Sequence, residues 1–219
     1  MIVAVVPAYN EEEHISHVVK SLLAHVDKII VIDDGSDDAT ADKAKTAGAI
    51  VLRHIINRGQ GAGYETAHEY ARMINADFVV HFDADEQFDV ADIIPAVKEL
   101  QKQQADVLFG SRFLGIDSNI PWSKQNIILP IARIVDSWFS GLKLSDAHNG
   151  FRVLNKRALE KIHVTQDRMA NATEIPAQVR HHHLKYIEFP VHVTYHEYGQ
   201  KFGNGFITIR DLLFGKMIK

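Results

Sequence analysis

Polar side chains that could bind a ligand occur in short groups, each directly after an apolar run of the sequence. The groups are Tyr9-Asn10-Glu11 after residues 2–6, Asp33-Asp34 after residues 28–32, and Asp83 with Asp85 after residues 78–82. In an open parallel sheet, ligands bind beyond the carboxyl ends of the strands. If the apolar runs are strands of such a sheet, these groups converge on one edge and form a binding site.

The acidic stretch Asp83-Ala84-Asp85-Glu86-Gln87 is the sharpest of these groups. Its alternate carboxylates bring hard oxygen ligands toward one point, which suits Mg²⁺ or Mn²⁺. A divalent ion there would neutralise the charge that a diphosphate leaving group gathers as its bond breaks. The alternative is a pair of capping aspartates ahead of the helix expected at Ala91. The convergence with the other polar groups favours the metal site.

The segments between these groups alternate between β-branched runs and amphipathic helical patterns. Ile15, Val18 and Leu22 recur at helical spacing, and Asn10 with Glu13 predicts the N-cap of that helix with its reciprocal carboxylate. Alternation of strands and helices predicts a parallel, doubly wound sheet. We therefore expect an α/β fold: a single Rossmann-like domain with a mostly parallel sheet and helices on both faces.

The overall composition is that of a globular protein, and it excludes several classes of protein. The chain has 219 residues, of which 46% are hydrophobic and 24% charged, so one domain spanning residues 1–219 is expected. The formal net charge of -4, without a block of like charge, disfavours a nucleic-acid partner. The absence of cysteine excludes disulfides and thiolate metal sites. Apolar runs stay shorter than the roughly 18 residues that a membrane span needs.

The pattern of the sequence changes from about Gly115. Residues 127–139 are apolar around most of a helix circumference, and later strands are expected near residues 152–154 and 187–193. The chain closes with an amphipathic segment at residues 206–219. These segments predict a later half that differs in organisation from the regular alternation before it.

Several motifs occur in the order found in family 2 glycosyltransferases of the GT-A fold, which this sequence resembles. They are VVPAYNEEE, VIDDGSDDAT, NRGQGAG, DFVVHFDADEQ, DVLFGSRF and DAHNGFRVLNKRAL. The resemblance extends to the branch containing dolichol-phosphate mannose synthase and bacterial polyprenyl-phosphate sugar transferases. It implies an enzyme of the hexosyltransferase class, with a nucleotide-sugar-binding half at residues 1–112 and an acceptor-side half at residues 113–219.

The resemblance also assigns the donor side of the site. The nucleotide base and ribose would be lined by Pro7, Ala8, Tyr9 and Glu11, and the ribose and diphosphate would lie near Arg58, Gly59 and Gly61. Asp34 would accept a hydrogen bond from the base imide, with Asp33 the weaker candidate of that pair. The donor would touch Asp83, Ala84 and Asp85, and the ion would be held by Asp83, Asp85 and Gln87. Glu86 departs from the apolar residue usual in that motif and adds a local charge.

On the acceptor side, the resemblance implies that Arg112 meets a phosphate, where a guanidinium can fork onto two oxygens. Lys124 lies where this branch often has a basic residue, and Lys201 follows a late loop that closes over the diphosphate in relatives. Asp146 and Arg152 flank the family's acceptor-side motif. For this last pair, a structural ion pair that ties a loop to a strand is an equally weighted alternative.

The sequence also bears on the class of acceptor. A hydroxyl acceptor needs a carboxylate base, and Glu174 stands alone where relatives of that type usually carry an acidic pair. A phosphomonoester has a second pKa of about 6 and is already a nucleophile at neutral pH. We therefore expect Asp85 and Arg112 to carry the reaction with a polyprenyl-phosphate acceptor. The alternatives are a polysaccharide hydroxyl with Glu174 as base, and a non-catalytic nucleotide-sugar-binding protein.

This acceptor predicts where the protein works. We expect a cytoplasmic protein, peripheral at the inner face of the cell membrane, with residues 127–139 beside the lipid or buried, and residues 206–219 on the membrane surface or docked on the domain. Small members of this branch resemble ones that work beside a separate small membrane protein, which predicts such a partner here. A homo-oligomer is compatible with the sequence.

Overall fold

The computed structural model describes residues 1–114, 141–147, 149–168 and 171–194. The apolar segment 127–139, the terminal segment 206–219, Lys124 and Lys201 lie outside these residues. Their predicted roles therefore stay predictions.

A seven-stranded sheet forms the centre of the molecule, in the order β3-β2-β1-β4-β6-β5-β7. The strands are β1 (Ile2–Ala8), β2 (Lys28–Asp33), β3 (Ile50–Arg53), β4 (Phe78–His81), β5 (Val107–Ser111), β6 (Arg152–Asn155) and β7 (Tyr186–Pro190). Neighbouring strands are parallel except for β6, which is antiparallel to both β4 and β5. The predicted α/β fold with a mostly parallel sheet is confirmed.

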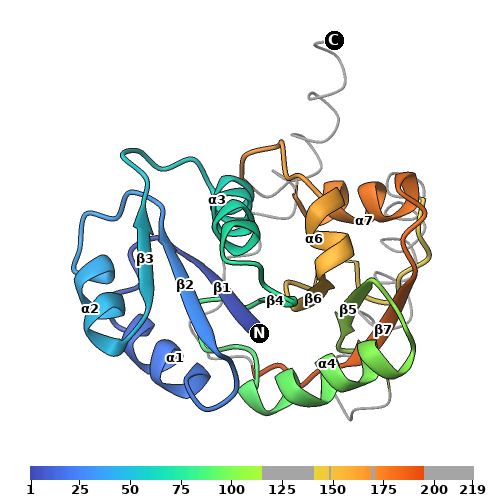
Figure 1. Cartoon of the computed structure of the whole chain (residues 1–219). Helices are drawn as coiled ribbons and strands as arrows, with labels where there is room; N and C mark the ends of the chain where they lie inside the picture. The colour runs from blue at the N-terminus through green and yellow to red at the C-terminus, as the bar shows by residue number, and fades with distance from the viewer. Residues whose placement is uncertain (115–140, 148, 169–170, 195–219) are drawn as a thin grey trace, which may run out of the picture.

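Helices cover both faces of the sheet, as Figure 1 shows. One face carries α1 (Ile15–Leu22), α2 (Thr40–Ala47) and α4 (Ile93–Lys102), which follows the short helix η1 (Val90–Asp92). The other face carries α3 (Gln60–Met73), α6 (Lys156–Lys161) and α7 (Asn171–His181). This arrangement explains why the central strands are continuous apolar runs, since both of their faces are buried. In the part of the chain described, no helix is long and apolar enough to cross a membrane.

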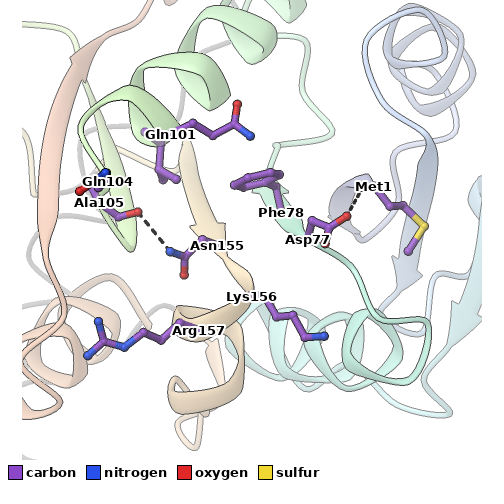
Figure 2. Close-up of a pocket in the computed structure, with 10 residues that line it drawn as sticks. Met1, Asp77, Phe78, Gln101, Gln104, Ala105, Asn155, Lys156 and Arg157 are labelled. Carbon is purple, nitrogen blue, oxygen red and sulfur yellow. Dashed lines mark hydrogen bonds and ion pairs between the residues drawn. The ribbon is translucent and has the colours of Figure 1, made fainter.

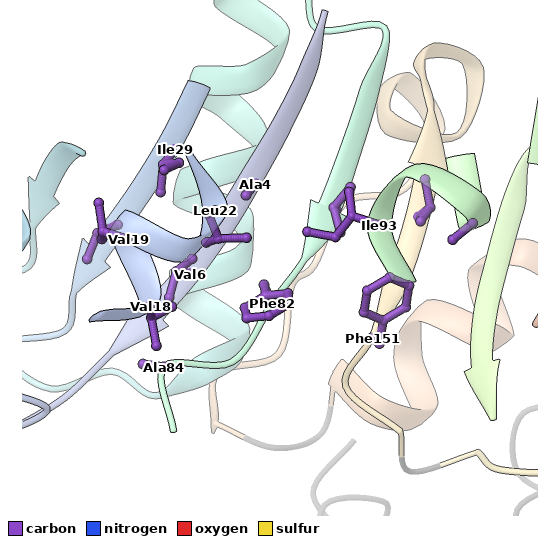
Figure 3. Packing of buried hydrophobic residues seen from close by; sticks show 14 of the residues in the cluster. Ala4, Val6, Val18, Val19, Leu22, Ile29, Phe82, Ala84, Ile93 and Phe151 are labelled. Carbon is purple, nitrogen blue, oxygen red and sulfur yellow. The ribbon is translucent and has the colours of Figure 1, made fainter. Parts of the chain in front are cut away.

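The core is therefore divided into two layers by the sheet. Figure 3 shows the layer beneath α1 and α4, where Val6 and Phe82 pack with Leu22, Ile93 and Phe151. All of these side chains are at most 1% exposed. Each contributes about 1.5–3 kcal/mol by leaving water, so the layer holds α1 and α4 firmly against the strands.

The direction of β6 decides which loops meet. Because β6 runs antiparallel between β4 and β5, its first residue lies near the carboxyl ends of both neighbours. Arg152, the first residue of β6, pairs with His81 at the end of β4 and with Phe109 in β5. The chain entering β6 therefore arrives at the same edge as the acidic stretch that follows β4.

Candidate active site

The loops after β1 and β2 meet at the carboxyl edge of the sheet, as the strand order requires. Asp34 donates its backbone N–H to the carbonyl of Ala8 at 2.9 Å, and Asn10 donates its N–H to Ser36 Oγ at 2.9 Å. Asn10 has a φ of 56° and accepts a hydrogen bond on Oδ1 from the Asp37 N–H at 3.0 Å. The predicted N-cap at Asn10 is wrong: α1 begins at Ile15, and Asn10 instead ties the first loop to the second.

Asp34 is the anchor of the glycine-containing loop that precedes α3. Its carboxylate accepts hydrogen bonds from the backbone N–H groups of Arg58 and Gly59, at 3.0 and 2.6 Å. His54 Nδ1 lies 2.6 Å from the same carboxylate, and Asp34 is only 4% exposed. The Asp34 carboxylate therefore holds the loop at Arg58 and Gly59 in place. Its predicted contact with the nucleotide base stays a prediction.

Asp33, the residue before Asp34, has a structural role. It is fully buried, accepts a hydrogen bond from the Ser36 N–H at 3.0 Å, and forms an ion pair with Arg53 Nε at 2.9 Å. These contacts close the turn after β2 and tie it to β3.

The loop at residues 165–168 packs directly against the glycine loop. A Cβ at Gly59, whose φ is 96°, would lie 2.5 Å from Arg168 Cα, and one at Gly61 would lie 2.1 Å from the Gln166 carbonyl oxygen. Arg58 adds an ion pair between its Nη2 and Asp167 Oδ1 at 3.0 Å. Glycine is required at both positions because the two backbones approach so closely.

Glu174, in the first turn of α7, holds this loop in place. Its carboxylate accepts hydrogen bonds from the Thr165 N–H at 2.9 Å, the Thr165 hydroxyl at 2.5 Å and the Gln166 N–H at 3.1 Å. These hydrogen bonds tie the first turn of α7 to the loop at residues 165–166.

Asp83 lies half-buried where β4 ends, with each of its oxygens in a different environment. Oδ1 accepts hydrogen bonds from Gln60 Nε2 at 3.2 Å and the Tyr64 hydroxyl at 3.4 Å. Oδ2 faces Gly150, where an added Cβ would lie only 2.6 Å away. Burial raises the pKa of Asp83 to about 6, and the negative charge of Asp85 adds to this rise.

The acidic groups at this edge are close enough to repel one another. Asp85 raises the pKa of Asp83. Burial raises the pKa of Glu11 as well; His14 lowers it, and the charge of Asp85 adds to the rise. Asp85 itself accepts a hydrogen bond from the Gln87 N–H at 3.2 Å. A set of hard carboxylate oxygens that repel one another fits a divalent cation such as Mg²⁺ or Mn²⁺.

Glu86, the unusual residue of the acidic stretch, faces the helix beside it. It has a φ of 60°, and its Oε1 lies 3.8 Å from His14 Nδ1 and 3.4 Å from His17 Nδ1. The extra carboxylate therefore lies beside two histidines at the start of α1.

Arg112 and Asp146 form a bidentate pair after β5. Asp146 accepts hydrogen bonds from Arg112 Nε at 2.6 Å, Nη2 at 2.7 Å and the backbone N–H at 3.1 Å. Asn149 donates to Asp146 as well, and the next residue is Gly150, which lies against Asp83. Asp146 and Gly150, which are close together in the chain, therefore connect the arginine to Asp83.

Arg152 lies close to the polar groups Tyr64, Asp83 and Asp146. It is 2% exposed, and burial lowers its pKa, an effect opposed by Tyr64, Asp83 and Asp146. Among the described residues, its Nε has no hydrogen-bond partner. The alternative of a structural ion pair between Asp146 and Arg152 takes a different form: Asp146 pairs with Arg112, and Arg152 provides a buried positive charge near Asp83 and Asp146. The predicted acceptor-side roles of Asp146 and Arg152 stay predictions.

A hollow of about 710 Å³ lies at the opposite edge of the sheet, near the start of β1 and β4. Figure 2 shows its wall, with the N-terminal amine against Asp77 and Asn155 donating to the Ala105 carbonyl. It is remote from the acidic groups, so it is not the site that their chemistry defines.

The fold and this edge together define a GT-A-type glycosyltransferase. The sequence profile of the family described as Glycosyl transferase family 2 matches residues 3–163, and the chain belongs to that family.

Relatives extend over the whole length of the chain. The uncharacterized protein MJ1222 of Methanocaldococcus jannaschii is 34% identical, over 97% of this chain and 89% of that protein. The UDP-N-acetylglucosamine--dolichyl-phosphate N-acetylglucosaminyltransferase of Methanococcus voltae is 28% identical, over 100% of this chain and 97% of that protein. The crystal structure of glucosyl-3-phosphoglycerate synthase from Mycobacterium tuberculosis with Mn²⁺ and UDP-glucose superimposes with a TM-score of 0.71, at 17% identity, over 97% of this chain and 76% of that one.

The remaining predicted residues lie where the strand order places them. Pro7 and Ala8 end β1, Tyr9 is 45% exposed beyond it, and Ala84 and Gln87 flank Asp85. Sequence reasoning missed Gln60 and Tyr64, which contact Asp83 from α3. Gln60 stands inside the motif NRGQGAG, but nothing in the sequence shows that the start of α3 reaches the end of β4.

We expect Gly150→Ala to impair the acidic site without unfolding the protein. The new methyl group would displace Asp83 Oδ2, because the two atoms would be 2.6 Å apart. Calorimetry should show about tenfold weaker binding of UDP in the presence of Mn²⁺, the size of a lost charged contact. The unfolding temperature checks the fold, and unchanged Mn²⁺-dependent binding would contradict the contact.

Asp83→Asn should stabilise the metal-free protein at pH 7.5. The pKa of Asp83 is raised from 3.8 to about 6, so its ionised form destabilises the fold progressively as pH rises through that interval. In urea unfolding with EDTA, we expect a gain of about 1–3 kcal/mol at pH 7.5 and little change near pH 4. A loss of stability at pH 7.5 would show that the acidic site is not strained.

Proposed function

We propose that this glycosyltransferase moves a hexose, with inversion, from a UDP-sugar to a polyprenyl phosphate. The observation that carries the proposal is that Asp146, which holds Arg112 in a bidentate pair, and Gly150, which lies against Asp83, are close together in the chain. A cation-binding acidic pair and an arginine side by side suit a reaction in which one phosphate group leaves and another attacks.

On the donor side, Asp83, Asp85 and Gln87 would hold Mg²⁺ or Mn²⁺. When bound, the ion would neutralise the diphosphate as it leaves. The base and ribose would lie on Pro7, Ala8, Tyr9, Glu11 and Asp34, and the diphosphate near Arg58, Gly59 and Gly61. Support comes from the structural neighbour crystallised with Mn²⁺ and UDP-glucose, and from a UDP-sugar named in the Methanococcus voltae relative.

On the acceptor side, a phosphate oxygen would attack the anomeric carbon, forming the new C–O bond as the bond to UDP breaks. The dianionic phosphate has no proton to lose, so this step needs no base. Arg112 would orient the phosphate, and its fixed geometry against Asp146 means that little side-chain freedom is lost on binding. Asp146, Arg152, Lys124 and Lys201 would complete the surroundings of the acceptor and the diphosphate.

The hydroxyl acceptor is the second candidate, with Glu174 as its base. The three hydrogen bonds from Thr165 and Gln166 to Glu174 weigh against it, since they engage this carboxylate in loop anchoring. The dolichyl phosphate named in a relative that matches over the full chain also favours a phosphate acceptor. A non-catalytic nucleotide-sugar-binding protein is the third candidate, and membership of an enzyme family weighs against it.

The proposed acceptor places the protein at the inner face of the cell membrane, peripheral on its cytoplasmic side. A small membrane protein as partner, and self-association, belong to the same proposal. So does the division into a donor half at 1–112 and an acceptor half at 113–219. Its support is that the donor-side residues precede position 113 while Asp146 and Glu174 follow it.

The direct test is to incubate the protein with Mg²⁺, undecaprenyl phosphate and a panel of UDP-, GDP- and dTDP-sugars. Mass spectrometry should find a glycosylated lipid phosphate with a UDP-sugar. Asp85→Asn should reduce its formation at least about a hundredfold, because transition-state charge then lacks its counter-ion. Product with a free sugar hydroxyl as acceptor, or unchanged turnover in Asp85→Asn, would refute the proposal.

Arg112→Lys should separate acceptor binding from donor binding. A lysine cannot reproduce the bidentate contact, so we expect transfer to undecaprenyl phosphate to fall about tenfold or more. Binding of Mn²⁺ and UDP, measured by calorimetry, should be unchanged. Arg157→Lys is the matched control, because Arg157 pairs with Asp106 near the opposite edge of the sheet. Equal losses in both variants would contradict the assignment.

A further inference from the structure

Next to Asp83 lies a buried polar cluster, of which the proposed reaction uses only Arg152. It consists of Tyr64 and His68 from α3, His81 from β4 and Arg152 from β6, and all of them are at most 2% exposed. The Nδ1 atoms of His68 and His81, and Arg152 Nε, have no hydrogen-bond partner among the described residues. Burying such groups costs stability compared with apolar side chains, so their presence calls for a functional reason.

Tyr64 connects this cluster to the acidic site. Its ring stacks on the ring of His81, with centroids 4.0 Å apart and an angle of 14° between the planes. Its hydroxyl points at Asp83 Oδ1 at 3.4 Å, and Gln60 Nε2 lies 3.2 Å from the same oxygen. A carboxylate offers no hydrogen, so Tyr64 and Gln60 are the donors.

The two histidines fix the ring on which Tyr64 stacks. Their Nε2 atoms are 2.8 Å apart, so one ring donates a hydrogen bond and the other accepts it. His68 belongs to α3, and His81 is the last residue of β4. This hydrogen bond therefore locks α3 to β4 two residues before Asp83, and it leaves the Tyr64 ring little freedom to rotate.

The consequence is an asymmetric carboxylate. Oδ1 accepts hydrogen bonds from Tyr64 and Gln60, whereas Oδ2 accepts none from the described residues and lies against Gly150, where an added Cβ would be 2.6 Å away. We propose that Tyr64 is a positioning residue that orients Asp83 so that Oδ2 alone meets the cation and nucleotide. The inference rests on the proposed function, in which Asp83 holds a divalent cation.

The test measures how much Mn²⁺ strengthens UDP binding, as the ratio of the dissociation constants in EDTA and in Mn²⁺, by calorimetry. Tyr64→Phe keeps the ring and removes the hydroxyl. We expect the ratio to fall about fivefold, the net size of one ordinary hydrogen bond, while UDP binding in EDTA stays unchanged. Tyr70→Phe on the same helix is the matched control and should leave the ratio unchanged.

A wild-type ratio in folded Tyr64→Phe would overturn the inference. So would equal weakening with and without Mn²⁺, which is what a merely structural role predicts. Gln60→Met removes the other hydrogen-bond donor to Oδ1 and should also lower the ratio. If Tyr64→Phe does not fold, Gln60→Met takes its place in the test, and a wild-type ratio in that variant overturns the inference. A ratio of about one in the wild-type protein would instead refute the metal site of the proposed function, and this result is read from the wild type alone.

Discussion

Repulsion between carboxylates at one edge of the sheet is the constraint around which this structure is organised. Asp83, Asp85 and Glu11 come from the ends of adjacent parallel strands, where the topology brings them together. Holding like charges in a half-buried place is costly unless a cation or a nearby positive charge balances them. The fold supplies part of this balance through buried Arg152, and a divalent ion would supply the rest.

Other acids of the same edge serve a different purpose, because they anchor loops through backbone N–H groups. Asp34 binds the loop at Arg58 and Gly59, Asp146 binds Arg112, and Glu174 binds the loop at residues 165–166. These hydrogen bonds hold the backbone of each loop in place. The loops that would surround a ligand are therefore ordered before it arrives, which lowers the entropy cost of binding.

Parts of the sequence that are far apart in the chain pack directly against one another at this edge of the sheet. The loop at 165–168 lies on Gly59 and Gly61, and Gly150 lies on Asp83. Glycine at these positions permits contacts that any side chain would block. The family's enzymes must bring a sugar donor and an acceptor together. Such contacts would fix the relative positions of the loops that carry the reacting groups.

The sequence by itself determined the alternating α/β pattern, the continuous apolar strands and the acidic groups after them, because burial and turn chemistry are local properties. The resemblance to the family also predicted which residues belong to the donor side and which to the acceptor side. The tertiary structure alone decided the antiparallel direction of β6, the pairing of Arg112 with Asp146, and the contact of Tyr64 with Asp83. These depend on which segments far apart in the chain become neighbours. Local pattern cannot specify that, since the side chains that choose a partner lie many residues away.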